Sequence, residues 1–508
     1  MNITHVLQTN LTPEQLRAAT DPLKEILCLA CAGSGKSRTL AFRIARLIAE
    51  GEPPESIVAF TFTEKAAESI KRRVSDALQK AGLSPSVIGA MYIGTIHSYC
   101  KFLLGEMDAK YRQFDVLDPN RLQLYLISRY ASLGLQNIRN QRTVLRQQRA
   151  PDGYPQGYFE LIKKVAEAWS NLNDESLQIE DVINENPELG NVLQAMYDGL
   201  NREQFIDYSL MIRLIVDALQ VNDERINRAI SIIRHLMVDE YQDVNPSQEL
   251  LISGIHKRTG TLFVVGDDDQ AIYSWRGADV SNILTFQNRY PNCSPHYLNT
   301  NFRSCSTIVN AATGFITRQL GAQRIHKTPI PYPPNQIYPN QVGKFFFSVR
   351  PDEAKWVAGR IKSLLGTTYH DGDITRGLCP SDFAILMKST NSTEQDGSLR
   401  HAAFTQALEE LNILYYIENQ GSIFDYSCVR VLQSAFEKLR DNNLNRNVLQ
   451  AFFNDEVLSV FPHANFSKSS EVFTKWQREI HQPISAGTRR KVNPQEILHE
   501  ILNAFNIQ

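Results

Sequence analysis

Short, continuous apolar runs recur along the chain, at residues 26–29, 56–60, 236–238 and 261–265. Each run is too short for a helix and lacks polar alternation, which is typical of a parallel strand buried on both faces. Amphipathic segments at 40–48 and 64–78 follow the first two runs and predict helices. This succession of strands and helices predicts an α/β fold built on a parallel sheet.

Between residues 101 and 206 the pattern changes to polar, helical segments, with Pro and Gly interruptions at 151–157. This stretch has no phosphate-binding chemistry, so we interpret it as a helical insertion. Its aromatic residues, Trp169 among them, are expected to pack rather than to bind a ligand.

The junction between the first strand and the first helix reads Ala30-Cys31-Ala32-Gly33-Ser34-Gly35-Lys36-Ser37. A small-residue loop that ends in Gly-Lys-Ser between a strand and a helix is typical of a phosphate-binding P-loop. Its glycines let backbone N–H groups turn toward a phosphate, and the helix N-terminus favours the same charge. We expect Lys36 to reach the β/γ-phosphates and Ser37 to ligate Mg²⁺, whereas the alternative is an ordinary Gly/Ser turn. The residues expected to contact the nucleotide here are Ala32, Gly33, Ser34, Gly35, Lys36, Ser37 and Arg38.

Two strand ends can supply the rest of a nucleotide hydrolase. The strand at 236–238 is followed by Asp239, which we expect to hold Mg²⁺, and by Glu240, which we expect to orient and deprotonate the attacking water. Beyond the strand at 261–265, Gln270 can touch the γ-phosphate.

A helix is predicted to begin at Thr12, with Pro13 in its first turn and Gln15 facing the P-loop. The amide of Gln15 offers a donor and an acceptor, which matches the edge of adenine. An ordinary capped helix is the alternative interpretation.

Rings and hydroxyls lie at the strand ends, where open α/β sheets bind ligands. We expect an exposed ring at Phe62, and such rings and hydroxyls suit base stacking and phosphate contact with a single strand. The basic run at 71–73 is instead expected to be a solvated helix face. The candidate DNA-binding residues are Phe62, Thr63, Thr95, His97, Tyr273, Trp275 and Arg276.

The length of 508 residues predicts about three or four domains at ~100–200 residues each. The sequence lacks an apolar stretch of ~18 residues and a basic-then-apolar N-terminal signal, so we expect a cytoplasmic protein without a membrane partner. Seven scattered cysteines fit a reducing compartment. Cys28 and Cys31 are not expected to bind a metal, because they lie within the P-loop strand. The net charge of −2 neither indicates nor excludes a nucleic-acid partner.

Taken in order, these segments resemble the UvrD/Rep-type superfamily 1 DNA helicases. The resemblance implies ATP and Mg²⁺ as cofactors and single-stranded or partly duplex DNA as partner. It also implies that Phe302 stacks on adenine, where family members usually have tyrosine, and that Arg303 reaches the γ-phosphate. The segments that carry it are 11–15, 30–37, 60–74, 94–98, 238–248, 265–278 and Leu298-Asn299-Thr300-Asn301-Phe302-Arg303-Ser304.

The resemblance implies a P-loop NTPase (RecA-like) parallel sheet with a helical insertion, plus an incomplete second RecA-like domain. The family's closing Lys-Gly-Leu-Glu-like and Thr-Arg motifs do not occur before Gln508, so we expect a truncated chain. The implied domains are an ATP-binding motor domain 1A at 1–105 and 207–297, a helical insertion 1B at 106–206, a partial RecA-like domain 2A at 298–440, and the start of a helical insertion 2B at 441–508.

The sequence thus predicts an ATP-dependent motor on single-stranded DNA, a translocase or helicase in repair, recombination or antiviral defence, with 3′–5′ polarity by resemblance. The alternative is a nucleotide-gated DNA-binding subunit that signals to a nuclease partner and does not unwind. A P-loop kinase is disfavoured, because such an enzyme has no use for the aromatic segment at 270–276.

Overall fold

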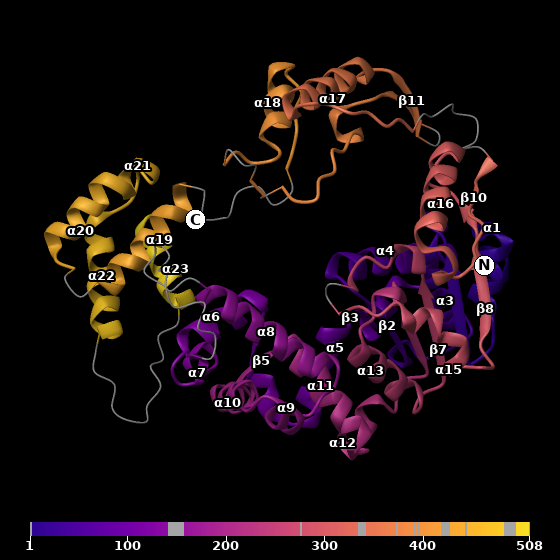
Figure 1. Cartoon of the computed structure of the whole chain (residues 1–508), viewed down its shortest axis with the longest axis horizontal. Coiled ribbons are helices and arrows are strands. Elements are labelled where there is room, and N and C mark those ends of the chain that lie inside the picture. Colours follow the sequence, from indigo (N-terminus) through magenta and orange to yellow (C-terminus); the bar gives the residue numbers. More distant parts are fainter. Residues whose placement is uncertain are drawn as a thin grey trace. The chain divides into compact units, whose positions relative to one another are not determined.

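The computed structural model describes residues 3–140, 157–274, 277–333, 342–371, 374–390, 392–393, 397–417, 427–441, 444–481 and 494–506. Its contacts divide the chain into two compact units, residues 1–343 and 344–508 (Figure 1). None of the described helices combines the length and apolar composition that a bilayer crossing requires.

The first unit is built on a six-stranded sheet in which every neighbouring pair is parallel. The predicted parallel sheet is therefore confirmed, and each apolar run forms a strand. In spatial order the strands are β3 (Tyr92–Thr95), β2 (Ile57–Thr61), β6 (His235–Val238), β7 (Thr261–Gly266), β1 (Glu25–Ala30) and β8 (Ser294–Leu298).

Helices cover both faces of this sheet, because side chains alternate across each strand and both faces are apolar. In β1, Ile26 and Cys28 belong to the core on one face, whereas Leu27 and Leu29 belong to the core on the other. The first face packs against α1 (Ile3–Asn10), α2 (Pro13–Thr20), α3 (Lys36–Ala49) and α4 (Glu64–Lys80). The second packs against α5 (Ile96–Met107), α11 (Tyr208–Gln220) and α13 (Pro246–His256).

The described residues between 101 and 206 are mainly helical, as predicted. Trp169 is fully buried and donates from Nε1 to Asp207 Oδ1 at 2.9 Å, so it packs as expected. The elements are β4 (Asp115–Leu117), which pairs in parallel with β5 (Phe205–Asp207), and α6 (Pro119–Ser128), α7 (Leu135–Asn140), α8 (Tyr158–Asp174), α9 (Ile179–Glu185) and α10 (Pro187–Glu203).

The remainder of the first unit returns to the sheet edge. Strand β9 (Thr300–Asn301) pairs in parallel with β10 (Ile330–Pro331), on either side of α16 (Ser306–Leu320). The expected domain boundary at 298 stays a prediction, since the contacts divide the chain after Gly343. Three short helices precede this part: α12 (Glu224–Ile230), α14 (Ser281–Leu284) and α15 (Phe286–Arg289).

Among its described residues the second unit has two small cores. One lies between α17 (Arg350–Leu364) and α18 (Ala402–Glu410), beside an antiparallel hairpin of β11 (Thr368–Asp371) and β12 (Ile374–Gly377). The other is formed by α19 (Ser427–Arg440), α20 (Arg446–Phe452), α21 (Leu458–Val460), α22 (Phe466–His481) and α23 (Pro494–Ala504).

The described part of this second unit shows no parallel sheet, so the incomplete second RecA-like domain stays a prediction. Segments 383–387 and 413–417 have the apolar pattern of strands. Phe383, Ile385 and Ile413 pack against the α17–α18 core, yet these segments form no ladder with one another among the described residues.

Candidate nucleotide and DNA-binding site

The loop between β1 and α3 has the backbone shape of a phosphate cradle. Gly33 and Gly35 have φ values of +70° and +86°, in the left-handed region that favours glycine. A Cβ at Gly33 would lie 2.7 Å from Arg303 Cβ, and one at Gly35 would lie 2.5 Å from Gln15 Nε2. Both glycines are therefore required by neighbours that are themselves predicted nucleotide ligands.

Two strand ends bring the predicted catalytic residues together. Lys36 Nζ donates to Glu240 Oε2 at 2.6 Å, and Ser37 Oγ donates to Asp239 Oδ2 at 3.4 Å. Strands β1 and β6 flank β7 and run parallel to it, so their carboxyl ends meet at one edge of the sheet. The residue pairs expected for phosphate and Mg²⁺ binding thus face each other across this edge.

Asp239 is buried beside a second carboxylate, and both circumstances disfavour its charge. Burial and the charge of Glu240 raise the pKa of Asp239 to about 6, against the opposing effects of Lys36 and of hydrogen bonds from Glu240 N and Ser37. Burial and Glu240 likewise raise the pKa of Asp243 to about 6. A cation at this edge would stabilise the ionised carboxylates.

The oxygen donors fit Mg²⁺, which usually binds one or two carboxylates together with substrate phosphates. Asp239 and the hydroxyl of Ser37 are such donors. Among the described residues there is no group of three or more His, Cys, Asp or Glu side chains arranged to hold a metal ion.

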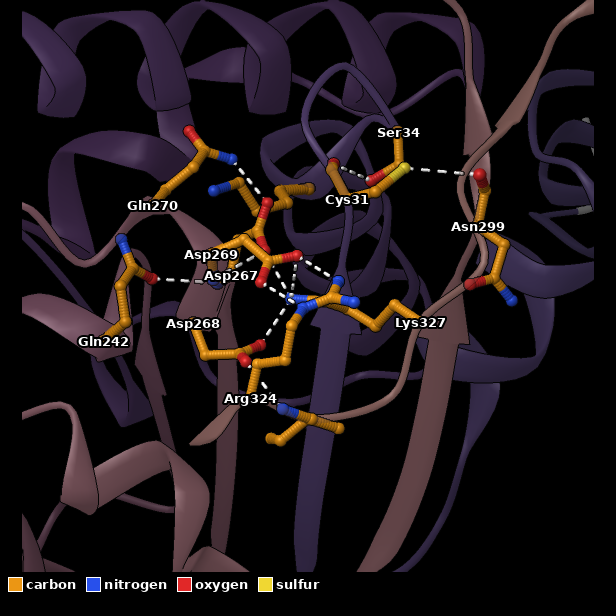
Figure 2. Close-up of polar contacts among 12 residues, drawn as sticks. Cys31, Ser34, Gln242, Asp267, Asp268, Asp269, Gln270, Asn299, Arg324 and Lys327 are labelled. Atoms are coloured by element: carbon orange, nitrogen blue, oxygen red, sulfur yellow. Dashed lines mark hydrogen bonds and ion pairs between the residues drawn. The ribbon is translucent and has the colours of Figure 1, made fainter. Parts of the chain in front are cut away.

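A buried glutamine that the sequence reasoning missed connects the two catalytic loops. Gln242 donates from Nε2 to Glu240 Oε2 at 3.1 Å, and its Oε1 accepts from the backbone N–H of Asp267 at 2.9 Å. Asp267 in turn accepts from Gln270 Nε2 at 2.6 Å (Figure 2). Glu240 and Gln270, expected on the γ-phosphate side, thus belong to one hydrogen-bond chain.

The predicted helix start at Thr12 is confirmed, because its side chain accepts from Gln15 N in a capping box with Pro13 in the first turn. Gln15 faces the P-loop and donates from Nε2 to Ser34 O at 2.8 Å. Arg38 donates from Nε and Nη2 to Asn10 O at 3.0 and 2.7 Å, which fixes its guanidinium beside α1.

The segment after β8 lies directly on the P-loop. Phe302 N donates to Gly33 O at 3.0 Å, and Asn301 Nδ2 donates to Ala32 O at 2.7 Å. The ring of Phe302 lies 4.9 Å from that of Tyr332, at an interplanar angle of 47°. The contacts of Asn301 and Tyr332 follow from the pairing of β9 with β10, and no pattern in the sequence predicts that pairing.

The candidate DNA residues differ in exposure. Phe62 is partly buried rather than fully exposed, because its ring packs against the core on one face of the sheet. The hydroxyls of Thr63 and Thr95 cap α4 and α5, accepting from Ala66 N and Ser98 N. Tyr273 is 39% exposed. Trp275 and Arg276 lie outside the described residues.

His97 is half-buried with its ring 4.9 Å from the ring of Tyr208. Burial lowers the pKa of His97 to about 4, so the imidazole is neutral at neutral pH. It can stack or form hydrogen bonds there but contributes no positive charge toward a phosphate.

A P-loop and an Asp-Glu pair at the carboxyl edge of one parallel sheet define a P-loop NTPase site. A family model described as the UvrD/REP helicase N-terminal domain matches residues 11–291, more than half of the chain. The chain therefore belongs to the UvrD/REP helicase family. The individual ligand and catalytic roles stay predictions.

Several curated relatives carry the name ATP-dependent DNA helicase PcrA. The protein from Staphylococcus epidermidis is 32% identical over 322 residues, covering 61% of this chain and 40% of the relative. That from Leuconostoc citreum is 28% identical over 393 residues, covering 75% and 47%. That from Staphylococcus aureus is 31% identical over 322 residues, covering 61% and 40%. The matched part of this chain thus corresponds to less than half of each relative.

We predict that Lys36→Ala weakens Mg-ATP binding by about tenfold or more, because a charged hydrogen bond of about 1.5–3 kcal/mol to phosphate is lost. Glu240→Gln is expected to keep binding and to lower turnover by ~10²–10⁴, the usual contribution of a general base. Nucleotide affinity and phosphate release are measured for both, with Lys71→Ala, a partly exposed lysine that pairs with Glu68 on α4, as the control. Equal loss of binding in both variants would contradict separate roles.

We predict that His97 makes the protein less stable as the pH falls from about 6.5 to about 4. The pKa of His97 is about 4 in the folded state and 6.5 in the unfolded chain. Between these pH values the unfolded chain binds the proton more readily, so acidification stabilises the unfolded state relative to the folded state. Urea unfolding midpoints at pH 7.5 and pH 5 are compared for wild type and His97→Gln, with exposed His5→Gln as control. The His97 variant should lose less stability on acidification, and an identical loss would refute the assignment.

Proposed function

We propose that this chain is an ATP- and Mg²⁺-dependent motor that acts on single-stranded or partly duplex DNA. The observation that carries the proposal is the apposition of Lys36 with Glu240 and of Ser37 with Asp239 at one sheet edge. Family membership supports the DNA substrate, and relatives named ATP-dependent DNA helicase support unwinding as the readout. The 3′–5′ polarity and a role in repair, recombination or antiviral defence belong to this proposal.

In the proposed mechanism the P-loop backbone and Lys36 hold the β/γ-phosphates of ATP. Lys36 then exchanges Glu240 for phosphate, which frees the Glu240 carboxylate to accept a proton from the attacking water. Gln242 keeps that carboxylate in place through its 3.1 Å hydrogen bond. Bound Mg²⁺ supplies charge neutralisation at the phosphate oxygens, with Asp239 and Ser37 as its protein ligands.

The adenine end of the site is proposed to lie between α2 and the β9–β10 segment. Gln15, on α2, donates to the P-loop carbonyl of Ser34, and Phe302, in the segment after β9, donates from its backbone N–H to the carbonyl of Gly33. Arg303 follows Phe302 and is exposed, with its backbone N–H held by Asn301 Oδ1 at 2.9 Å. This placement leaves the Arg303 guanidinium available for the γ-phosphate role that the family resemblance implies.

DNA is proposed to bind at the carboxyl ends of β2 and β3 and at the loop that follows β7. Phe62 and Thr63 follow β2, Thr95 is the last residue of β3 and precedes His97 by two positions, and Tyr273 lies in the loop after β7. Because Thr63 and Thr95 cap α4 and α5, the N-termini of these two helices lie at the same edge of the sheet. The free backbone N–H groups of a helix N-terminus favour a phosphate. Domains 1A, 1B, 2A and 2B are assigned in this proposal with the boundaries given above.

The proposal is tested by phosphate release with and without single-stranded DNA, and by unwinding of duplexes with a 3′ or a 5′ tail. We expect DNA to stimulate hydrolysis and the Glu240→Gln variant to lose this stimulation, while unwinding that requires the 3′ tail would support the proposed polarity. Nucleotide-dependent DNA binding without stimulated hydrolysis would instead favour a DNA-binding subunit that signals to a nuclease or other partner.

We predict that Phe62→Ala and Trp275→Ala each weaken single-stranded DNA binding by about 1–3 kcal/mol, the usual size of one base-stacking contact. Hydrolysis in the absence of DNA should change less, because neither ring is proposed to touch the nucleotide. Fluorescence anisotropy with a labelled oligonucleotide measures the affinity, and Phe315→Ala, an exposed ring on α16, is the control. Unaltered DNA affinity with a lowered melting temperature would show that the rings serve only the core.

A further inference from the structure

A fully buried lysine outside the recognised sequence motifs is bound by consecutive aspartates of the loop after β7. Lys327 lies between α16 and β10, and its side chain is 1% exposed. Its Nζ donates to Asp267 Oδ1 at 2.5 Å and to Asp268 Oδ1, and it lies 3.4 Å from Asp269 Oδ2 (Figure 2). Neither the P-loop nor the Asp239–Glu240 pair explains why the chain buries this charge here.

The aspartates require a cation, because three adjacent carboxylates at a buried sheet edge repel one another. Burial opposes the charge on Lys327, but Asp267 and Asp268 outweigh it and raise the pKa of Lys327 above its ordinary value. The backbone adds a further contact, since Ile325 N donates to Asp268 Oδ2 at 2.8 Å. The loop after β7 is thus held in one conformation by the segment around Lys327.

Asp267 connects Lys327 to the predicted catalytic residues through hydrogen bonds. Its Oδ1 accepts from Lys327, while its Oδ2 accepts from Gln270 at 2.6 Å. Its backbone N–H donates to Gln242, which donates to Glu240. One residue therefore connects Lys327 with both side chains that are expected on the γ-phosphate side: Asp267 contacts Gln270 through its carboxylate and Gln242, which binds Glu240, through its backbone N–H.

The segment that carries Lys327 also reaches the other end of the nucleotide site. Three residues beyond Lys327, Ile330 N donates to Asn299 O at 2.8 Å, and Tyr332 then packs its ring against Phe302. Residues 324–332 therefore touch the loop of Gln270 and the segment of Phe302 at once.

We propose that Lys327 is a positioning residue for ATP hydrolysis, which fixes Asp267 so that Gln270 and, through Gln242, Glu240 are aligned with the γ-phosphate. In this role it couples the 324–332 segment to the hydrolytic residues. The inference rests on the proposed ATPase function and deepens it, because it assigns a residue outside the family's motifs.

Arg324 provides a matched control within the same loop. It donates from Nε and Nη2 to the two carboxylate oxygens of Asp269 at 2.7 and 2.5 Å. The carboxylate of Asp269 contacts Arg324 and Lys327, whereas the link to Gln270 and Gln242 runs through Asp267. Arg324 therefore stabilises the loop without holding the aspartate that contacts the catalytic side chains.

The test compares Lys327→Met, Lys327→Arg and Arg324→Gln in the full chain. For each, the affinities for ATP and ADP are measured, together with kcat and KM for DNA-stimulated hydrolysis. We expect Lys327→Met to lower kcat and the preference for ATP over ADP by about tenfold each, the effect of one displaced charged hydrogen-bond partner, while ADP affinity changes little. Lys327→Arg should fall between wild type and Lys327→Met, and Arg324→Gln should keep the wild-type ATP preference.

A double-mutant cycle separates positioning from stability. Because Lys327 acts through Gln270 and Glu240, Lys327→Met should have much less effect on ATP preference in a Gln270→Ala background than in wild type. If Lys327→Met does not fold, the charge-balanced pair Lys327→Met with Asp268→Asn replaces it, with Asp268→Asn alone as its reference.

The outcomes distinguish this inference from the function on which it rests. A wild-type chain that binds no ATP would overturn both. Wild-type binding and hydrolysis together with an unchanged ATP preference and kcat in the Lys327 variants would overturn the inference alone. Full additivity with Gln270→Ala, or an equal effect of Arg324→Gln, would reduce Lys327 to a structural ion pair and likewise overturn it.

Discussion

The structure depends on neutralising the negative charge at the carboxyl edge of its sheet. The loops after β6 and β7 place six carboxylates there, namely Asp239, Glu240, Asp243, Asp267, Asp268 and Asp269. Parallel strands put all these loops on one side of the molecule, so the charges cannot be dispersed. Burying them requires cations, and the chain supplies Lys36 from the P-loop and Lys327 and Arg324 from beyond α16. Segments hundreds of residues apart are thereby joined at the nucleotide site.

Side-chain amides connect these charges without adding new ones. Gln242 bridges Glu240 and Asp267, Gln270 binds Asp267, and Asn301 binds the P-loop carbonyl of Ala32. An amide can donate and accept at once, so it links a carboxylate to a backbone group in either direction. A charged bridge in the same place would add a further buried ion to neutralise. The amides therefore hold the carboxylates in fixed positions around Lys36 without adding a further buried charge.

The sequence predicts those features whose causes are local. The P-loop, the helix start at Thr12 and the Asp239–Glu240 pair each combine an apolar run with adjacent residues of defined chemistry, and the structure places them together. Lys327 and Gln242 were not predicted, because their roles come from long-range packing and no local pattern marks them. The ring expected to be exposed at Phe62 is instead partly buried, because the residue that follows β2 packs against core residues distant in the sequence.

The contacts that join residues 298–333 to the rest of the site differ in how easily they can be exchanged. Phe302 N and Asn301 Nδ2 bind P-loop carbonyls through neutral hydrogen bonds, each worth about 0.5–1.5 kcal/mol and replaceable by water. Separating Lys327 from its aspartates would leave buried charges without partners, which costs several times more. A rearrangement of this segment therefore costs least free energy at the P-loop and most at the loop of Gln270. The ion pairs of Lys327 are thus the fixed contacts of this segment, and the hydrogen bonds of Phe302 and Asn301 to the P-loop are the contacts that can open.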